Sequence, residues 1–339
     1  MAALPLFLVG EFGDAAERRM ELTQGGKMNI SIGINVPQDV NGVADVERLR
    51  RFVESAEREG YDSLWVSESV KPNVLDPLAV LNFMASATRN VRLGAAVLLP
   101  AYRAPLQLAR ELASFDQLSG GRSIFGVGLG NDREQYARLG LDPGHRGKHF
   151  EAGIRLLRDL MSNDRVTERN QWWELDQVPR PLPPVQRPTP PIWFGARHPV
   201  ALERAVRLGD GWIGAGSMTR ASFVDALDQI RDLLGRAGRN SANFTVAKRV
   251  YLHVADDHSR VEMIRDWFGH RYGRAQLAED VVVLGDADAC VEHLNGLAAM
   301  GVTTLILHPM VDMHRQMQAI ARDVIPRVSG AFRGHNLDR

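Results

Sequence analysis

Cysteine is scarce in this chain of 339 residues, and net charge and long apolar runs are absent. Cys290 is the only cysteine, so no disulfide can form within the chain. The 41 lysine and arginine side chains are matched by 41 aspartate and glutamate side chains, so bulk charge attracts neither nucleic acid nor an anionic membrane. No apolar run approaches the roughly 20 residues that a membrane-spanning helix needs.

A signal peptide is not predicted either. Residues 4–9 form a short apolar stretch, but no basic region precedes it. The first strand-like segment opens at Met28, so residues 1–27 are predicted to be a disordered N-terminal extension. We therefore expect a cytoplasmic protein.

Strand-like and helix-like segments alternate along the rest of the chain. Short apolar runs predict strands at 28–36, 63–66, 91–98, 123–127, 192–194, 212–213, 244–254 and 303–307. A helical pattern follows each of these runs, and two helices are expected between 258 and 300. The strands are nearly all apolar and do not alternate, as in a parallel sheet that helices cover on both faces.

Eight such units predict a single α/β domain, a (β/α)8 or TIM barrel over residues 28–330, with a short tail at 331–339. Residues 142–191 are predicted to be a large insertion, and the proline-rich stretch 179–191 inside it predicts an extended linker. The alternative is an open doubly wound sheet, which the evenness of the eight units disfavours.

In such a barrel, functional residues lie in the loops after the carboxyl ends of the strands. Two of these loops are glycine-rich and lead into predicted helices, GARHP at 195–199 and GAGS at 214–217. Backbone N–H groups of a glycine turn, together with a helix N-terminus, attract an anion. The sequence therefore predicts a phosphate-bearing ligand. The alternative is that these glycines only permit tight turns.

The loop after the fourth strand, GVGLGN at 126–131, has a different pattern. It is not G-x-G-x-x-G, because Asn131 stands where the last glycine belongs, and no acidic residue ends the next strand. A nicotinamide site of the Rossmann type is therefore disfavoured. Glycines in this position suit a flat ring that lies against the backbone.

Glu68 places a carboxylate at the end of the second strand. We expect it to act as a general base or to bond a ring nitrogen, and the alternative is a salt bridge to a loop arginine such as Arg103. His145 and His149 have the spacing of one helix face, but without a third ligand a solvated helix start is favoured over a metal site.

Longer segments combine these motifs: AEREGYDSLWVSES, RNVRLGAAVLLPAYRAPLQLARELASFDQLSGGRSIFGVGLG, PTPPIWFGARHPVALERAVRLGDGWIGAG and GVTTLILHP. In their order and spacing the chain resembles the bacterial luciferase-like family of flavin-dependent oxidoreductases. Within that family it is most similar to the branch that uses the deazaflavin coenzyme F420. The resemblance covers roughly residues 28–330.

The resemblance implies a cofactor site at the barrel mouth. In this family the third strand ends in a bulge, often with a non-prolyl cis peptide, against the central ring of the cofactor; here the bond is Ala96–Val97. The implied catalytic residues are Glu68, Ser69 and Asn131. The implied cofactor-binding residues are Asn35, Ala96, Val97, Leu98, Gly128, Gly130, Asn131, Gly195, Ala196, Arg197, Gly214, Ala215 and Gly216.

Departures from the family pattern bear on the reaction. Several F420-dependent dehydrogenases of this family carry Asp-His after strand two and Glu after the glycines of strand four, where this chain has Glu68, Ser69 and Asn131. This difference disfavours oxidation of an alcohol or a sugar phosphate by their mechanism.

Three functions remain open. We expect an enzyme that transfers a hydride between F420 and a small organic substrate. The alternatives are an FMN-dependent monooxygenase that takes reduced flavin from a separate cofactor-reducing enzyme, and a non-catalytic flavin- or deazaflavin-binding protein. The resemblance also implies a homodimer formed through early helices, whose apolar stripes at 75–83 and 106–118 exceed what one barrel face needs.

Overall fold

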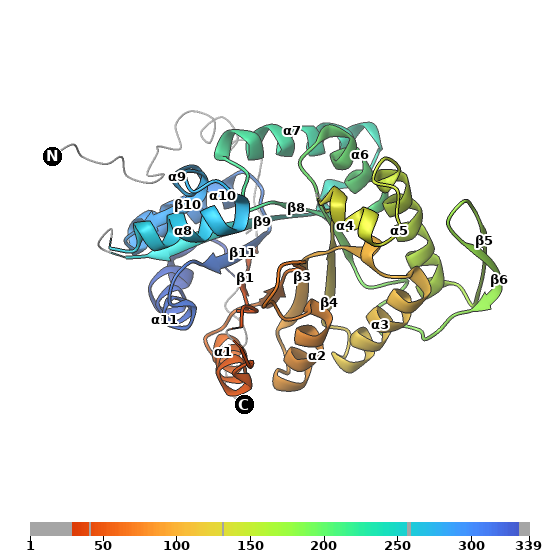
Figure 1. Ribbon diagram of the computed structural model, residues 1–339. Coiled ribbons are helices and arrows are strands. Elements are labelled where there is room, and N and C mark those ends of the chain that lie inside the picture. Colours follow the sequence, from red (N-terminus) through yellow and green to blue (C-terminus); the bar gives the residue numbers. More distant parts are fainter. Residues whose placement is uncertain (1–28, 41, 131, 256–258, 332–339) are drawn as a thin grey trace.

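The computed structural model describes residues 29–40, 42–130, 132–255 and 259–331. Within these ranges, eight parallel strands close into a barrel, which confirms the predicted fold (Figure 1). The barrel closes because β11 pairs with β1 and β8 pairs with β9. Around the barrel the strands are β1 (Ser31–Asn35), β2 (Ser63–Val66), β3 (Arg92–Leu98), β4 (Ser123–Val127), β7 (Ile192–Gly195), β8 (Gly211–Gly214), β9 (Thr245–Val254) and β11 (Thr304–Pro309).

Helices surround the barrel (Figure 1). Those in its ring include α1 (Val46–Arg58), α2 (Pro77–Ala87), α3 (Pro105–Leu118), α5 (Arg146–Ser162), α6 (Pro199–Leu208), α7 (Arg220–Arg236), α10 (Ala287–Ala299) and α11 (Met313–Ala319), and α4 (Arg133–Arg138) follows β4. Asp45, Asp76 and Thr219 fix the starts of α1, α2 and α7, because their side chains accept N–H groups of the first turn. None of the described helices is long and apolar enough to span a membrane.

Two tryptophans and several aliphatic side chains fill the inside of the barrel. Trp65 from β2 and Trp193 from β7 lie with their ring centroids 5.6 Å apart. Gly33 and Gly94 leave room for Trp65, since a Cβ at Gly94 would lie 2.3 Å from the Trp65 ring. The interior is thus a packed core, and a binding site is left to the loops at the carboxyl ends of the strands.

The region between 258 and 300, expected to contain helices alone, includes a strand. This strand, β10 (Val282–Gly285), lies with α8 (Val261–Tyr272), α9 (Leu277–Val281) and α10. It pairs with residues 251–254 of β9, beyond the part of β9 that pairs with β8. The expectation was wrong because periodicity cannot distinguish a run of a few apolar residues from part of a buried helix.

The predicted insertion 142–191 contains both a barrel helix and a hairpin. Helix α5 packs against α3 and belongs to the helical ring. The hairpin of β5 (Arg165–Arg169) and β6 (Glu174–Pro179) projects from the edge of the molecule (Figure 1). At its turn, Trp172 and Trp173 pack on His149 of α5, with ring centroids 5.4 and 5.0 Å away.

Candidate active site

A cleft of about 660 Å³ opens where four barrel strands end, β1, β2, β9 and β11. Asn35 and Ser69, two of the predicted site residues, lie in its wall. Ser67, Arg249 and His308 line it as well. The cleft therefore lies on the face where TIM barrels carry their sites.

The third strand ends in the predicted bulge. The Ala96–Val97 peptide bond is cis, which confirms that prediction, and the register of β3 on β4 shifts between Ala95 and Leu98. The Val97 side chain lies over two glycines of neighbouring strands: a Cβ at Gly128 or Gly195 would come within 2.6 or 2.9 Å of its methyl carbons. Glycine at these two positions makes room for the bulge.

Hydrogen bonds from β9 and from the loop after β2 hold the bulge in place. The Ala96 carbonyl accepts hydrogen bonds from Ser67 Oγ at 3.0 Å and from the Arg249 guanidinium at 3.2 Å. The backbone N–H of Glu68 donates to the Val97 carbonyl at 3.0 Å. Residues of β9 and of the loop after β2 thus fix the backbone that, by the family resemblance, is expected to face a cofactor ring.

Glu68 forms the salt bridge that was the alternative to a catalytic role. One carboxylate oxygen lies 2.6 Å from Arg103, and the other accepts the Leu99 N–H at 2.5 Å. Burial raises the pKa of Glu68, while Arg103 and the Leu99 N–H lower it. Both oxygens are engaged, and the residue is not part of the cleft wall described above.

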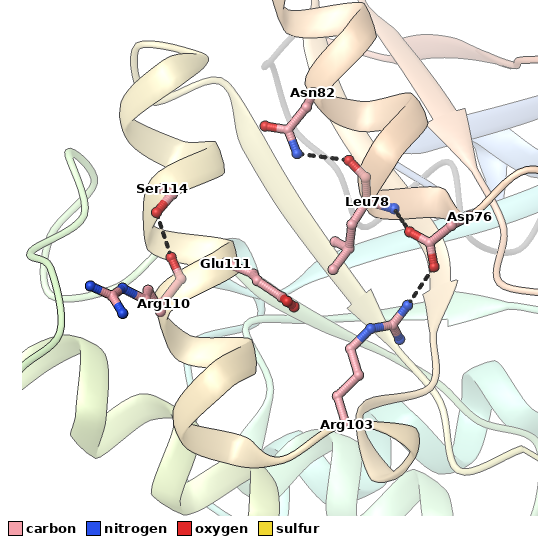
Figure 2. A pocket seen from close by; sticks show the side chains of 7 residues that line it. All are labelled: Asp76, Leu78, Asn82, Arg103, Arg110, Glu111 and Ser114. Carbon is pink, nitrogen blue, oxygen red and sulfur yellow. Dashed lines mark hydrogen bonds and ion pairs between the residues drawn. The ribbon is translucent and has the colours of Figure 1, made fainter.

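Arg103 links Glu68 to the outside of the barrel. Its guanidinium also pairs with Asp76 at 2.9 Å, and Asp76 caps α2. Figure 2 shows this pair at one end of a groove of about 460 Å³ between α2 and α3. Glu111 of α3 points into the groove, and the structure gives its Oε2 atom no hydrogen-bond partner among the described residues.

The two glycine-rich turns predicted to bind phosphate follow adjacent strands, because β7 pairs with β8. Their carbonyls are fixed by side chains: Trp212 Nε1 donates to Ala196 O at 2.8 Å, and Lys248 Nζ donates to Ala215 O at 2.6 Å. A Cβ at Gly216 would lie 2.6 Å from the Tyr251 ring. Gly216 is therefore needed for packing, whatever the turn binds.

Some predicted residues lie elsewhere. Asn131 lies outside the described residues. His145 pairs with Asp142 at 2.6 Å on the surface, while His149 packs on the two tryptophans of the hairpin. Across the described ranges no group of three or more His, Cys, Asp or Glu side chains has the arrangement of a metal site.

Sequence reasoning missed Arg249 and His308. The Arg249 guanidinium donates to His308 Nδ1 at 2.8 Å and to Ser67 Oγ at 2.9 Å. Burial, and then Arg249 and Arg271, hold the pKa of His308 well below its usual range, so the imidazole is neutral. The signal was available: Lys248 and Arg249 are charged residues inside an otherwise apolar strand, where charge is costly unless it has a use.

The chain is similar in sequence and in fold to known oxidoreductases. Residues 27–304 match the model of the luciferase-like monooxygenase family. The chain is 26% identical to an F420-dependent glucose-6-phosphate dehydrogenase of Kineococcus radiotolerans, over 82% of this chain and 92% of that protein. It is also 26% identical to the 4-hydroxyprotoasukamycin monooxygenase of Streptomyces nodosus subsp. asukaensis, over 81% and 85%. A solved F420-dependent secondary alcohol dehydrogenase in complex with an F420-acetone adduct superposes with a TM-score of 0.78 and 18% identity, over 89% and 99%.

Proposed function

Because the chain belongs to the luciferase-like monooxygenase family, we propose that it is an oxidoreductase that transfers a hydride between coenzyme F420 and an organic substrate. The observation that carries the proposal is the bulge of β3 at the barrel mouth, backed by Gly128 and Gly195. A flat ring needs a wall free of long side chains, and Ala96, Val97 and glycine backbone form such a wall. When bound, F420 supplies the ring position that gives or takes the hydride.

The cofactor phosphate is proposed to bind the turns after β7 and β8. Gly195, Ala196 and Arg197 form one turn, and Gly214, Ala215 and Gly216 form the other. Each leads toward the N-terminus of a helix, α6 or α7, whose free N–H groups favour an anion. We place Gly130 and Leu98 beside the cofactor ring. Asn35 is proposed to lie at the far edge of the same ring.

Polar groups near the cofactor ring are proposed to transfer the protons of the reaction. Ser69 lies in the cleft wall, so we place its hydroxyl beside the substrate. Glu68 is proposed to act mainly through the bulge that it holds, and its role as a proton carrier stays a prediction, as does that of Asn131.

Titration of the purified protein with F420, FMN and FAD, followed by difference absorption, tests the cofactor. We expect F420 to bind and to be reduced or oxidised when a substrate is supplied. Tight binding of FMN with oxygen uptake, and none of F420, would overturn the proposal. Binding of F420 without turnover of any substrate in a broad panel would support a non-catalytic carrier.

A monooxygenase is the second candidate, because the monooxygenase relative spans most of this chain. That reaction would require a separate enzyme that delivers reduced FMN. Oxygen consumption that depends on an added flavin reductase distinguishes this reaction from F420 chemistry.

A cytoplasmic location is also part of the proposal, and cell fractionation tests it.

A homodimer through α2 and α3 is also proposed. The apolar stripe of α2 is used by the barrel itself, since Leu78, Val80 and Leu81 are buried, so this part of the sequence argument does not hold. Support comes instead from α3, where Leu118 is 71% exposed, and from the groove of Figure 2, where Glu111 leaves an oxygen unpartnered within the described part of the chain.

Sedimentation velocity tests the dimer. We expect the wild type to sediment as a dimer and Leu118→Glu to shift it toward monomer, because a charge on the contact face opposes association. Val200→Glu on α6 is the matched control, since Val200 is 68% exposed and lies outside the proposed interface. A monomeric wild type contradicts the proposal.

A further inference from the structure

Three cationic side chains line the cleft at the barrel mouth, Lys71, Arg249 and Arg271. Within the part of the chain that the structure describes, none of them forms an ion pair with a carboxylate. Asp39, at the exposed rim, is the one carboxylate that lines the cleft in that part. The cleft therefore carries positive charge that the described protein does not neutralise.

Arg249 is held by neutral acceptors alone. Its guanidinium donates to Ser67 Oγ, to the Ala96 carbonyl and to His308 Nδ1, and it lies 5.5 Å from the centroid of the Tyr251 ring. Its Nε atom is buried and has no hydrogen-bond partner among the described residues. A partly buried charge without a counter-charge is costly, and an anionic ligand would remove that cost.

Arg271 and Lys71 form one wall of the cleft. Arg271, near the end of α8, donates to Ser69 Oγ at 3.2 Å. Lys71, in the loop after β2, donates to the carbonyls of His270 and of Arg271, the latter at 3.2 Å. These bonds tie the loop to α8 and hold both charges at the cleft without cancelling either.

His308 adds a neutral donor. Because its Nδ1 atom accepts from Arg249, its proton is on Nε2, which has no partner among the described residues. The wall also has an apolar part, which includes Trp267, Met310, Met313 and Pro72. A volume of about 660 Å³ is in the range of sites for ring-sized organic molecules.

We propose that this cleft binds the substrate as an organic acid, with its carboxylate among Arg249, Arg271 and His308 and its apolar body on Trp267 and Met310. That this acid is the substrate rests on the proposed function. The cofactor phosphate is a different anion, because its proposed turns follow β7 and β8. The cleft is lined from β1, β2, β9 and β11, and no residue of those turns is part of its wall, although β9 pairs with β8.

Calorimetric titration of the full chain tests the site. The probes are benzoate, phenylacetate and cinnamate, each compared with its amide, which has the same shape and no charge. We expect at least one acid to bind and its amide to bind about tenfold or more weakly, as for loss of a charge-assisted hydrogen bond. Arg271→Gln should weaken the acid by about the same factor and leave the amide unchanged.

Arg274→Gln is the matched control, because Arg274 is exposed next to the end of α8 and does not line the cleft. Arg249→Gln is the second variant, with thermal unfolding measured to check its fold. The inference is overturned if no acid binds more tightly than its amide, or if the Arg271 and Arg274 variants behave alike.

Titration of the same samples with F420 separates this inference from the proposed function. We expect the dissociation constant of the acid to be unchanged by saturating F420. Competition between the two would mean that the cleft holds acidic groups of the cofactor, which overturns the inference. If F420 does not bind but the acid still binds through Arg271, the proposed function fails and the anion site stands.

Discussion

At the scale of single residues, Glu68 connects the barrel mouth with the helical ring. One of its oxygens pairs with Arg103 and the other accepts the Leu99 N–H, just past the β3 bulge. Glu68→Gln keeps the shape but removes the charge that Arg103 faces. Loss of one partner of a buried pair costs roughly 3 kcal/mol, so we expect a lower free energy of unfolding together with weaker cofactor binding.

The pH profile of kcat tells whether Glu68 positions the bulge or moves a proton. If it only positions the bulge, the profile of the Glu68→Gln variant keeps the shape of the wild-type profile while the dissociation constant for F420 rises. The opposite result, an unchanged dissociation constant with one limb of the profile lost, would mean that Glu68 carries the proton.

The second prediction at this scale concerns Lys248 and the pH dependence of the free energy of unfolding. Burial, and then the charge of Arg249, lower the pKa of Lys248 to about 7 from its ordinary value of 10.5. Between these values the unfolded chain holds a proton that the folded chain lacks, so this group makes the free energy of unfolding rise with pH.

Lys248→Met removes this titration. The free energy of unfolding of the variant minus that of the wild type should therefore be highest near pH 7 and fall as the pH approaches 10. Urea unfolding at several pH values measures the difference, in which groups common to both proteins cancel. A difference that does not change with pH would show that Lys248 titrates normally in the folded protein.

At the scale of elements, Asp76 both caps the start of α2 and forms an ion pair. Asp76 caps α2 by accepting the Leu78 and Ala79 N–H groups, and it also pairs with Arg103. Asp45 caps α1 by accepting the Arg48 N–H and forms no ion pair with another described residue, so it is a matched control. Both Asp→Ala variants should lose about 1 kcal/mol of cap stabilisation in urea unfolding.

Asp76→Ala should in addition weaken cofactor binding, because Arg103 loses one of its two carboxylates. Equal effects of the two variants on F420 titration would contradict a link from α2 to the barrel mouth.

The elements also show what sequence can reveal. All eight barrel strands were predictable because each is a largely apolar run bounded by turn residues. The strand β10 was not, since four apolar residues between two helices have no period that identifies them. The bulge at Ala96–Val97 came from resemblance to a family. The Arg249–His308 pair required the register of β9 and β11, which places the two side chains together in space but which no local pattern encodes.

At the scale of the whole molecule, the barrel interior depends on glycines that face Trp65. Gly94→Ala would place a Cβ 2.3 Å from the Trp65 ring in a core where neither group can move far, so we expect a loss of about 1–3 kcal/mol. Gly235→Ala in α7 is the control, because nothing lies within 4 Å of a Cβ there and alanine favours a helix.

Thermal unfolding of both variants checks this expectation. The melting temperature should fall for Gly94→Ala and stay level or rise for Gly235→Ala. A Gly94→Ala protein as stable as the wild type would mean that the interior can rearrange around Trp65.

The pair of Trp65 and Trp193 inside the barrel has a consequence for how ligands enter and leave the site. These rings pack with Ile124, Ile213 and Ile306 into one buried cluster inside the barrel, so we expect ligands to enter and leave by the mouth. A molecule that another ligand covers then has to bind before that ligand and dissociate after it. Where substrate covers cofactor, we therefore expect ordered binding.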